Sequence, residues 1–401
     1  MSSSLFAAVE MAPRDPILGL TEAFNAEKNP SKVNLGVGVY YNDEGKIPLL
    51  AAVRAAEKTR LEAAPPRGYQ PIEGTVAYNQ AVQNLLFGKD SALLAEGRVI
   101  TAQCLGGTGA LKVGADYLKR LLPDTKVYIS DPSWENHKAL FESAGFAVEN
   151  YPYYDAATRG VNFEGMKSCL KSLPAKSVIV LHACCHNPTG ADLTTAQWQE
   201  VVAAVKERNL VAFIDMAYQG FADGIDPDAV APRLFAESGL QFFVSSSFSK
   251  SFSLYGERVG ALSIVTASKE ESGRVLSQVK RVIRTNYSNP PTHGGAIVAA
   301  VLSSPELRQM WEDELAGMRE RIRTMRTGLV DKLKTRGVAQ DFSFVAKQRG
   351  MFSYTGLTAA QVERMKSEYG IFAVSTGRIC LAALNNKNID YVADAMAAIL
   401  K

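Results

Sequence analysis

Short apolar runs alternate with longer amphipathic stretches through the middle of the chain. Residues 99–105, 126–130, 177–182, 210–215 and 241–244 are nearly continuous apolar segments, each followed by a polar or glycine-rich loop. Runs of this length and character predict strands that are buried on both faces, and helical patterns between them predict crossover connections. We therefore expect an α/β fold whose large domain has a mostly parallel central sheet.

Helical patterns lie between these runs and continue after them. They predict helices at residues 49–63, 75–87, 106–118, 195–208, 294–302, 305–334, 358–369 and 388–400. Residues 282–291 are predicted to form a loop, and the spacing of Arg319, Arg323 and Arg326 is typical of a solvated helix face.

The last part of the chain predicts a second, smaller α+β domain, with strand-like segments at 351–354, 371–374 and 378–382. We expect an N-terminal arm at 1–15, a first part of the small domain at 16–46, the large domain at 47–315 and the rest of the small domain at 316–401. The arm is a candidate for packing on a partner subunit.

The composition of the chain excludes several classes of protein. The chain has 401 residues, of which 47% are hydrophobic and 21% charged, and a net charge of +3 without a long basic run, which argues against nucleic-acid binding. Its five scattered cysteines contain no CxxC pair, which argues against a disulfide framework and a structural zinc or other metal site. No stretch predicts a signal peptide or a membrane span. We expect a soluble cytoplasmic protein.

Lys250 lies in a serine-rich segment that follows the apolar run 241–244, and Arg258 comes eight residues later. A desolvated lysine, or one beside another cation, is a nucleophilic amine that can form a Schiff base, and hydroxyls with an arginine suit a phosphate. The alternative is an ordinary surface lysine in a solvated loop.

Other unusual residues also follow predicted strands: Gly107, Trp134, Asn187 and Asp215. A glycine turn before a helix can hold a phosphate or be a tight turn without a ligand. A tryptophan here can cover a flat cofactor or be core, and a buried aspartate requires a cationic partner. Ligands of parallel sheets bind beyond the carboxyl ends of the strands, where all of these residues are expected.

An amine, a phosphate cradle, a ring for stacking and a buried carboxylate in one crevice together describe a site for pyridoxal 5'-phosphate. The lysine holds the aldehyde of this cofactor as a Schiff base. The carboxylate keeps the pyridine nitrogen protonated, so that the ring accepts electrons.

Five motifs then stand in a specific order: Asn187-Pro188-Thr189-Gly190, Asp215-Met216-Ala217-Tyr218, Ser247-Phe248-Ser249-Lys250 with Arg258-Val259-Gly260, Asn286-Tyr287-Ser288-Asn289-Pro290-Pro291 and Ser375-Thr376-Gly377-Arg378. With these motifs the chain resembles the fold type I aminotransferases, specifically the aspartate and aromatic-amino-acid aminotransferase family, over nearly its whole length.

The resemblance implies roles for the residues at the ring of the cofactor. Lys250 would be the Schiff-base lysine and the proton shuttle. Asp215 would pair with the pyridine nitrogen, with His137 behind it. Tyr218 and Asn187 would donate hydrogen bonds to the ring oxygen.

The remaining assignments are also implied by the resemblance. Trp134 would stack on the ring and line the substrate side together with Asn187. The phosphate would be held by Gly107, Thr108, Ser247, Arg258 and, from the neighbouring subunit, Tyr69. Substrate would meet Gly38, Arg378 at its α-carboxylate and the neighbour's Arg284 at a side-chain carboxylate. Such sites require a homodimer with shared active sites, in which the small domain closes over bound substrate.

The implied function is transfer of the amino group of aspartate, phenylalanine or tyrosine to 2-oxoglutarate by a ping-pong mechanism, in amino acid metabolism. Residues 40–45 resemble the aromatic branch of the family, and Gly106 stands where aspartate-selective members commonly have a serine, whereas Asn289 follows the aspartate branch. We expect use of both substrate classes, with Arg284 swinging away from aromatic side chains. The alternatives are a fold type I enzyme that catalyses β-elimination or decarboxylation, since the same electron sink serves those reactions, and a non-enzymatic scaffold.

Overall fold

A seven-stranded sheet forms the centre of the computed structural model, which describes residues 4–12 and 18–401. The strands, in spatial order, are β2 (Val99–Leu105), β10 (Val259–Val265), β9 (Phe242–Ser247), β8 (Val211–Met216), β7 (Val178–His182), β3 (Lys126–Asp131) and β4 (Ala147–Pro152). β10 runs antiparallel to both of its neighbours, and the other pairs are parallel. The predicted α/β fold with a mostly parallel sheet is confirmed.

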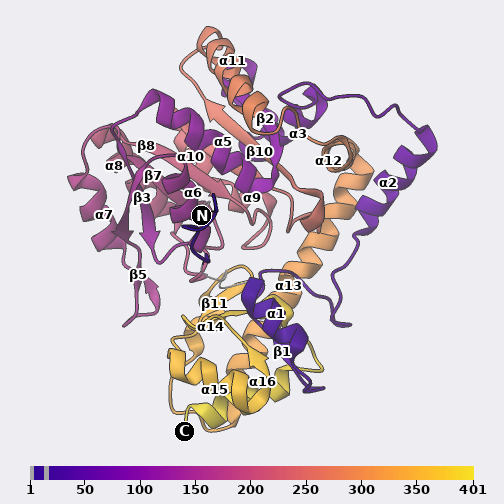
Figure 1. Ribbon diagram of the computed structural model, residues 1–401, viewed down its shortest axis with the longest axis vertical. Helices are drawn as coiled ribbons and strands as arrows, with labels where there is room; N and C mark the ends of the chain where they lie inside the picture. Colours follow the sequence, from indigo (N-terminus) through magenta and orange to yellow (C-terminus); the bar gives the residue numbers. More distant parts are fainter. Residues whose placement is uncertain (1–3, 13–17) are drawn as a thin grey trace.

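Helices cover both faces of this sheet (Figure 1). They are α3 (Val76–Phe87), α4 (Ala92–Ala95), α5 (Gly106–Leu121), α6 (Glu135–Ser143), α7 (Phe163–Ser172), α8 (Thr195–Arg208), α9 (Ile225–Asp228), α10 (Val230–Glu237), α11 (Lys269–Asn286) and α12 (Thr292–Ser303). Successive side chains of a strand therefore enter opposite cores: Ile214 lies in one apolar cluster and Phe213 in the other. Burial on both faces explains why the strands are continuous apolar runs.

A smaller group of elements lies below the sheet in Figure 1 and joins the two ends of the chain. β1 (Val33–Asn34) pairs in parallel with β12 (Ile371–Phe372), and β11 (Phe352–Tyr354) pairs with β13 (Arg378–Cys380). The helices are α1 (Leu18–Ala26), α14 (Ser343–Lys347), α15 (Ala359–Tyr369) and α16 (Ile389–Ile399). We call residues 18–46 and 316–401 the small lobe and residues 47–315 the large lobe.

One long helix, α13 (Pro305–Thr335), belongs to both lobes. It begins after Ser304, whose side chain accepts a hydrogen bond from the backbone N–H of Leu307. Its first half packs on α12 and α2 (Ala51–Ala63), and its second half on α14 and α16. Figure 1 shows it descending from the large lobe into the small one.

Two sequence interpretations are wrong. Residues 282–286, predicted as loop, are the last turn of α11, because Val279, Val282 and Ile283 form its buried face. Arg326 is not solvated, since only 2% of it is exposed. Its helical spacing with other arginines gave no sign of the backbone that covers it.

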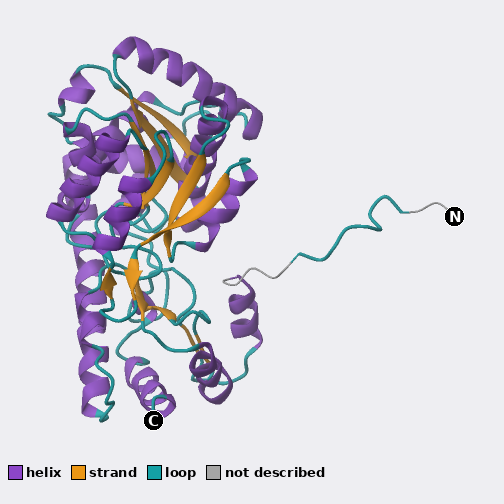
Figure 2. Ribbon diagram, turned by 90° about the vertical axis from the view of Figure 1, so that its left-hand side faces the viewer, coloured by secondary structure: helices purple, strands orange, loops and turns teal. Residues whose placement is uncertain are grey.

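The N-terminal segment 4–12 lies apart from both lobes in Figure 2, and Leu5 and Met11 are 86% and 96% exposed. The rest of the predicted arm, residues 1–3 and 13–15, falls outside the described residues. None of the described helices is both long enough and apolar enough to traverse a lipid bilayer.

Candidate active site

The ends of β8 and β9 open on a cavity of about 320 Å³ that reaches the small lobe. The predicted site residues that line it are Gly38, Gly107, Thr108, Trp134, Asn187, Asp215, Tyr218, Ser247, Lys250, Arg258 and Arg378. The structure therefore brings together residues that are spread over most of the sequence, as the strand-end argument requires.

Lys250 occupies the turn just after β9, at the bottom of this cavity. Burial, with a smaller contribution from the positive charge of Arg258, lowers the pKa of Lys250 to about 8 against the opposing charge of Asp215. Its Nζ lies 4.9 Å from the centre of the Tyr218 ring. An amine with such a pKa is partly neutral near pH 7 and can act as a nucleophile or a base.

Asp215 lies near the end of β8 and is 8% exposed. Its Oδ2 is 2.9 Å from Nε2 of His137, and its Oδ1 accepts a hydrogen bond of 2.8 Å from Oγ of Ser245. Burial raises the pKa of Asp215, but the hydrogen bond and charge of His137, with smaller contributions from His182 and Ser245, bring it below its ordinary value. Asp215 is therefore a carboxylate at neutral pH.

Glycines shape the opposite wall, where α5 begins. A Cβ added at Gly107 would lie 3.1 Å from Cβ of Ser247, and one at Gly106 would lie 2.6 Å from Nη2 of Arg258. The backbone N–H groups of a helix N-terminus, a hydroxyl and a guanidinium thus converge on one end of the cavity. This is the donor set that a phosphate group requires.

Arg378 forms the small-lobe side of the cavity and is 1% exposed. Its Nη2 donates to the Gly36 carbonyl at 2.7 Å, its Nη1 donates to Oδ1 of Asn187 at 3.1 Å, and Oε1 of Glu135 lies 3.8 Å away. Among the described residues its buried Nε has no hydrogen-bond partner. A carboxylate in the cavity is the group that this guanidinium lacks.

Comparison with known proteins agrees with this geometry. Residues 30–396 match the family described as aminotransferase class I and II. The chain belongs to the class I and II aminotransferase family. It is 68% identical over 397 residues to an aspartate aminotransferase of Pseudomonas aeruginosa, covering 99% of this chain and 100% of that one. It is 51% identical over 398 residues to the aromatic-amino-acid aminotransferase of Escherichia coli K12, covering 99% of this chain and 100% of that one.

Solved structures of this family have the same fold type I architecture. An aromatic-amino-acid aminotransferase from Burkholderia pseudomallei, covalently bound to pyridoxal phosphate, has a TM-score of 0.98 at 68% identity, with 100% of both chains covered. The cytoplasmic aspartate aminotransferase of Saccharomyces cerevisiae has a TM-score of 0.98 at 38% identity, covering 100% of this chain and 99% of that one.

Three predicted residues of this aminotransferase do not line the cavity. His137 lies outside it, with its Nε2 2.9 Å from Oδ2 of Asp215. Tyr69 is 95% exposed in the loop before α3, and Arg284 is exposed on the last turn of α11. Both were assigned to the site of a neighbouring subunit, which a single chain does not test.

The aminotransferase site also contains residues that the sequence interpretation missed, among them His182, Cys184, Tyr255 and Phe352. His182 pairs in register with Asp215 and lies 3.3 Å by its Nε2 from Oγ of Ser133, which also contacts His137. Burial, with the charge of His137, lowers the pKa of His182 to about 3, so it is neutral. Its place at the end of the apolar run 177–182 was the available signal.

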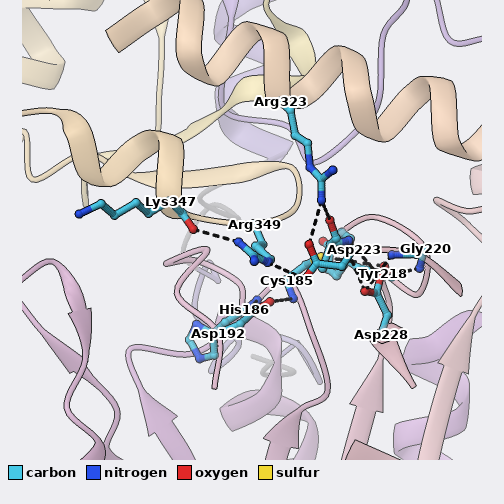
Figure 3. Close-up of polar contacts among 12 residues, drawn as sticks. Cys185, His186, Asp192, Tyr218, Gly220, Asp223, Asp228, Arg323, Lys347 and Arg349 are labelled. Atoms are coloured by element: carbon cyan, nitrogen blue, oxygen red, sulfur yellow. Dashed lines mark hydrogen bonds and ion pairs between the residues drawn. The ribbon is translucent and has the colours of Figure 1, made fainter. Parts of the chain in front are cut away.

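One group of side chains in the described part of the aminotransferase has the ligand types of a metal site: Cys184, Cys185 and Asp228, within 4.8 Å of one another. Asp228 is already used, because it accepts hydrogen bonds from the backbone N–H groups of Gly220, Ala222, Asp223 and Gly224. Burial also raises the pKa of Cys185 to about 11. Figure 3 shows this carboxylate closing the turn after Tyr218, which is a folding role.

Proposed function

We propose that this protein is a pyridoxal-phosphate-dependent aminotransferase that moves the amino group of aspartate and of the aromatic amino acids phenylalanine and tyrosine to 2-oxoglutarate. The observation that carries the proposal is the placement of a buried, partly neutral Lys250 and a buried, ionised Asp215 in one cavity with Arg378. The relatives named for aspartate and for aromatic substrates support both specificities.

The residues of the cavity fit this cofactor. Lys250 offers the amine for its aldehyde, and Asp215 the carboxylate for its ring nitrogen. Asn187 and Tyr218 offer donors for its ring oxygen, and Trp134 offers a ring to stack on. The donors at the N-terminus of α5 with Ser247 and Arg258 suit its phosphate. When bound, the group supplies an electron sink for the bonds at the substrate α-carbon.

The chain's own groups would then divide the work. Lys250, once its amine is free, would carry the proton between the substrate α-carbon and the cofactor, for which a pKa near the working pH is suited. Asp215 would keep its negative charge through the cycle, because His137 and Ser245 hold it in the ionised form. Arg378 would bind the α-carboxylate through its planar fork.

We further propose a cytoplasmic homodimer with shared active sites, a large cofactor-binding domain at 47–315, and a small domain made of 16–46 and 316–401. The exposure of Tyr69, Arg284 and the apolar N-terminal side chains supports coverage by a second chain. The neighbour's Arg284 would bind the side-chain carboxylate of aspartate and move aside for an aromatic ring.

The visible absorbance of the purified protein tests the function. We expect a yellow band that bleaches on addition of aspartate or phenylalanine and returns with 2-oxoglutarate. Release of ammonia or carbon dioxide in place of amino transfer would support β-elimination or decarboxylation. The absence of a band after incubation with the cofactor would contradict the assignment altogether.

A further inference from the structure

The arginines on one face of α13 donate hydrogen bonds to backbone carbonyls, although Arg323 is also exposed to solvent. Arg319 donates to the Gly220 carbonyl at 2.7 Å, and Arg323 to the Ala222 carbonyl at 2.8 Å. Figure 3 shows that Arg323 also reaches the side chain of Asp223. The third arginine of this face, Arg326, points toward the small lobe and is the most buried of the three.

Arg326 acts as a clamp on one short segment, residues 345–352. Its Nη1 donates to the carbonyl of Val345 at 2.9 Å. Its Nη2 lies 2.5 Å from the carbonyl oxygen of Phe352, 2.8 Å from that of Gly350 and 3.2 Å from that of Arg349. Burial lowers the pKa of Arg326 to about 10, which leaves it charged at neutral pH. A planar fork of five donors can serve several carbonyls at once, whereas a lysine ammonium offers three donors from a single point.

The clamped segment ends at Phe352, whose ring forms part of the substrate end of the cavity. The guanidinium carbon of Arg378 lies 4.4 Å from the centre of this ring. On the other side, a Cβ added at Gly38 would lie 2.6 Å from Cζ of Phe352. The ring of Phe352 therefore lies between the Arg378 guanidinium and the backbone at Gly38.

The same segment also contacts the turn that carries Asn187. A Cβ at Gly190 would lie 2.7 Å from the carbonyl oxygen of Phe352, and the backbone N–H of Arg349 donates to the Gly190 carbonyl at 2.7 Å. Asn187, in this turn, accepts the hydrogen bond from Arg378. Two of the contacts that orient Arg378, the Phe352 ring and the Asn187 amide, thus depend on one segment.

We propose that Arg326 is a positioning residue for substrate recognition. By clamping residues 345–352 it fixes Phe352 and the Asn187 turn, and through them the orientation of Arg378 toward a substrate α-carboxylate. This inference rests on the proposed function, because it takes Arg378 as the α-carboxylate ligand. It concerns a residue that contacts neither cofactor nor substrate.

Arg326→Lys in the cofactor-loaded enzyme tests the inference. We expect KM to rise about tenfold for aspartate and for phenylalanine alike, because a small misplacement of a binding group weakens every substrate that uses it. We expect kcat to change less than KM. The visible absorbance without substrate and the affinity for pyridoxal phosphate should match those of the unaltered enzyme, because Lys250 and Asp215 lie on the large lobe.

The residue just after this helix provides a matched control. Arg336→Gln removes an arginine whose partners, Asp390 and Asp394, lie away from the cavity, and should alter thermal stability without altering either KM. If Arg326→Lys folds and leaves both KM values unchanged, as in the control, the proposal is wrong. A rise in KM for aspartate alone would also overturn the proposal. Such a result would mean that the variant disturbs binding of the substrate's side-chain carboxylate and not of its α-carboxylate.

If Arg326→Lys does not fold, Gly190→Ala provides a second test, because Gly190 contacts the Phe352 carbonyl from the turn that carries Asn187. Its methyl group would push against the Phe352 carbonyl, and the positive φ of Gly190 (+67°) would strain the Asn187 turn, so the same parallel rise in both KM values is expected, and unchanged values overturn the proposal. An unaltered enzyme that transfers no amino group would instead refute the proposed function, and so the two failures are distinguishable.

Discussion

The cofactor side and the substrate side of the cavity are built in different ways. On the cofactor side, Asp215 and Lys250 come from or just beyond adjacent strands of one sheet, and Asp215 is in register with Ser245. On the substrate side, Arg378 is held by Asn187 and by the Gly36 carbonyl, which are 191 and 342 residues away in the chain. The first arrangement depends on strand register, and the second on how distant segments assemble in the small lobe and how that lobe meets the large one.

This difference predicts different kinetic signatures. Substitutions on the cofactor side should remove chemistry and therefore lower kcat. Substitutions on the substrate side should weaken binding of a substrate carboxylate and therefore raise KM. Each of the following changes tests whether substitutions on the two sides differ in this way in their effects on kcat and KM.

Lys250→Ala should have the largest effect. It removes both the amine that holds the cofactor and the group that moves the proton, and so we expect kcat to fall by about 10⁴-fold or more. Single-turnover measurements of the visible absorbance would report the step directly. Lys167→Ala, a change in a surface ion pair, serves as the control and should leave kcat unaltered. Substantial turnover by Lys250→Ala would rule out the assigned role.

Arg284→Leu should affect one substrate class. Loss of a charged partner for the side-chain carboxylate should lower kcat/KM for aspartate about 100-fold, while kcat/KM for phenylalanine should be retained. Steady-state kinetics with both amino acids measures the ratio. If aspartate turnover stayed intact while aromatic turnover collapsed, the role given to Arg284 would be wrong.

Arg378→Lys should affect both classes. Replacing the planar fork by a single ammonium should raise KM by about 10- to 100-fold for aspartate and phenylalanine together. Binding of a simple dicarboxylate, followed by the cofactor absorbance, gives a second readout. A large change in kcat with unchanged KM would place Arg378 among the catalytic groups. It would contradict the expected difference between the two sides of the cavity.

The pH dependence of Lys250 should show the smallest effect. With a pKa of about 8, roughly a tenth of the amine is neutral at pH 7 in the cofactor-free chain, so its labelling by an amine-reactive reagent should rise through pH 8. Arg258→Gln removes a neighbouring cation and should move this midpoint upward, by on the order of one pH unit or less. Mass spectrometry of the peptide that contains Lys250 measures it. A midpoint near that of ordinary exposed lysines would contradict the burial argument.

The cofactor side could largely be predicted from the sequence, for a physical reason. Asp215 lies at the end of one apolar run and Lys250 in the polar segment that follows another, so recognising the strands also locates the residues near their ends. His182 was missed although it occupies the same position on β7, because the sequence does not show that β7 and β8 are neighbours in register.

The substrate side was accessible only through family resemblance. Nothing in the pattern around Arg378 or Gly38 indicates that they face the sheet, because that depends on the packing of the lobes. Arg326 was misinterpreted for a related reason, since arginines at helical spacing usually face water, and only the fold covers this one with carbonyls. The partner-dependent roles of Tyr69 and Arg284 stay predictions.

The helix α13 also has a mechanical consequence. Its 31 residues make a rod of about 46 Å that is shared by both lobes without interruption. A rod of this kind resists a sharp hinge, so the small lobe can move toward the large lobe only by bending or tilting α13 as a lever. Glycine is the least helix-favouring residue of the rod after proline, and Gly317 lies near its middle in open space, so the stiffness of the lever should be lowest there. Small angular changes near Gly317 would be amplified into larger displacements at the far end of the small lobe.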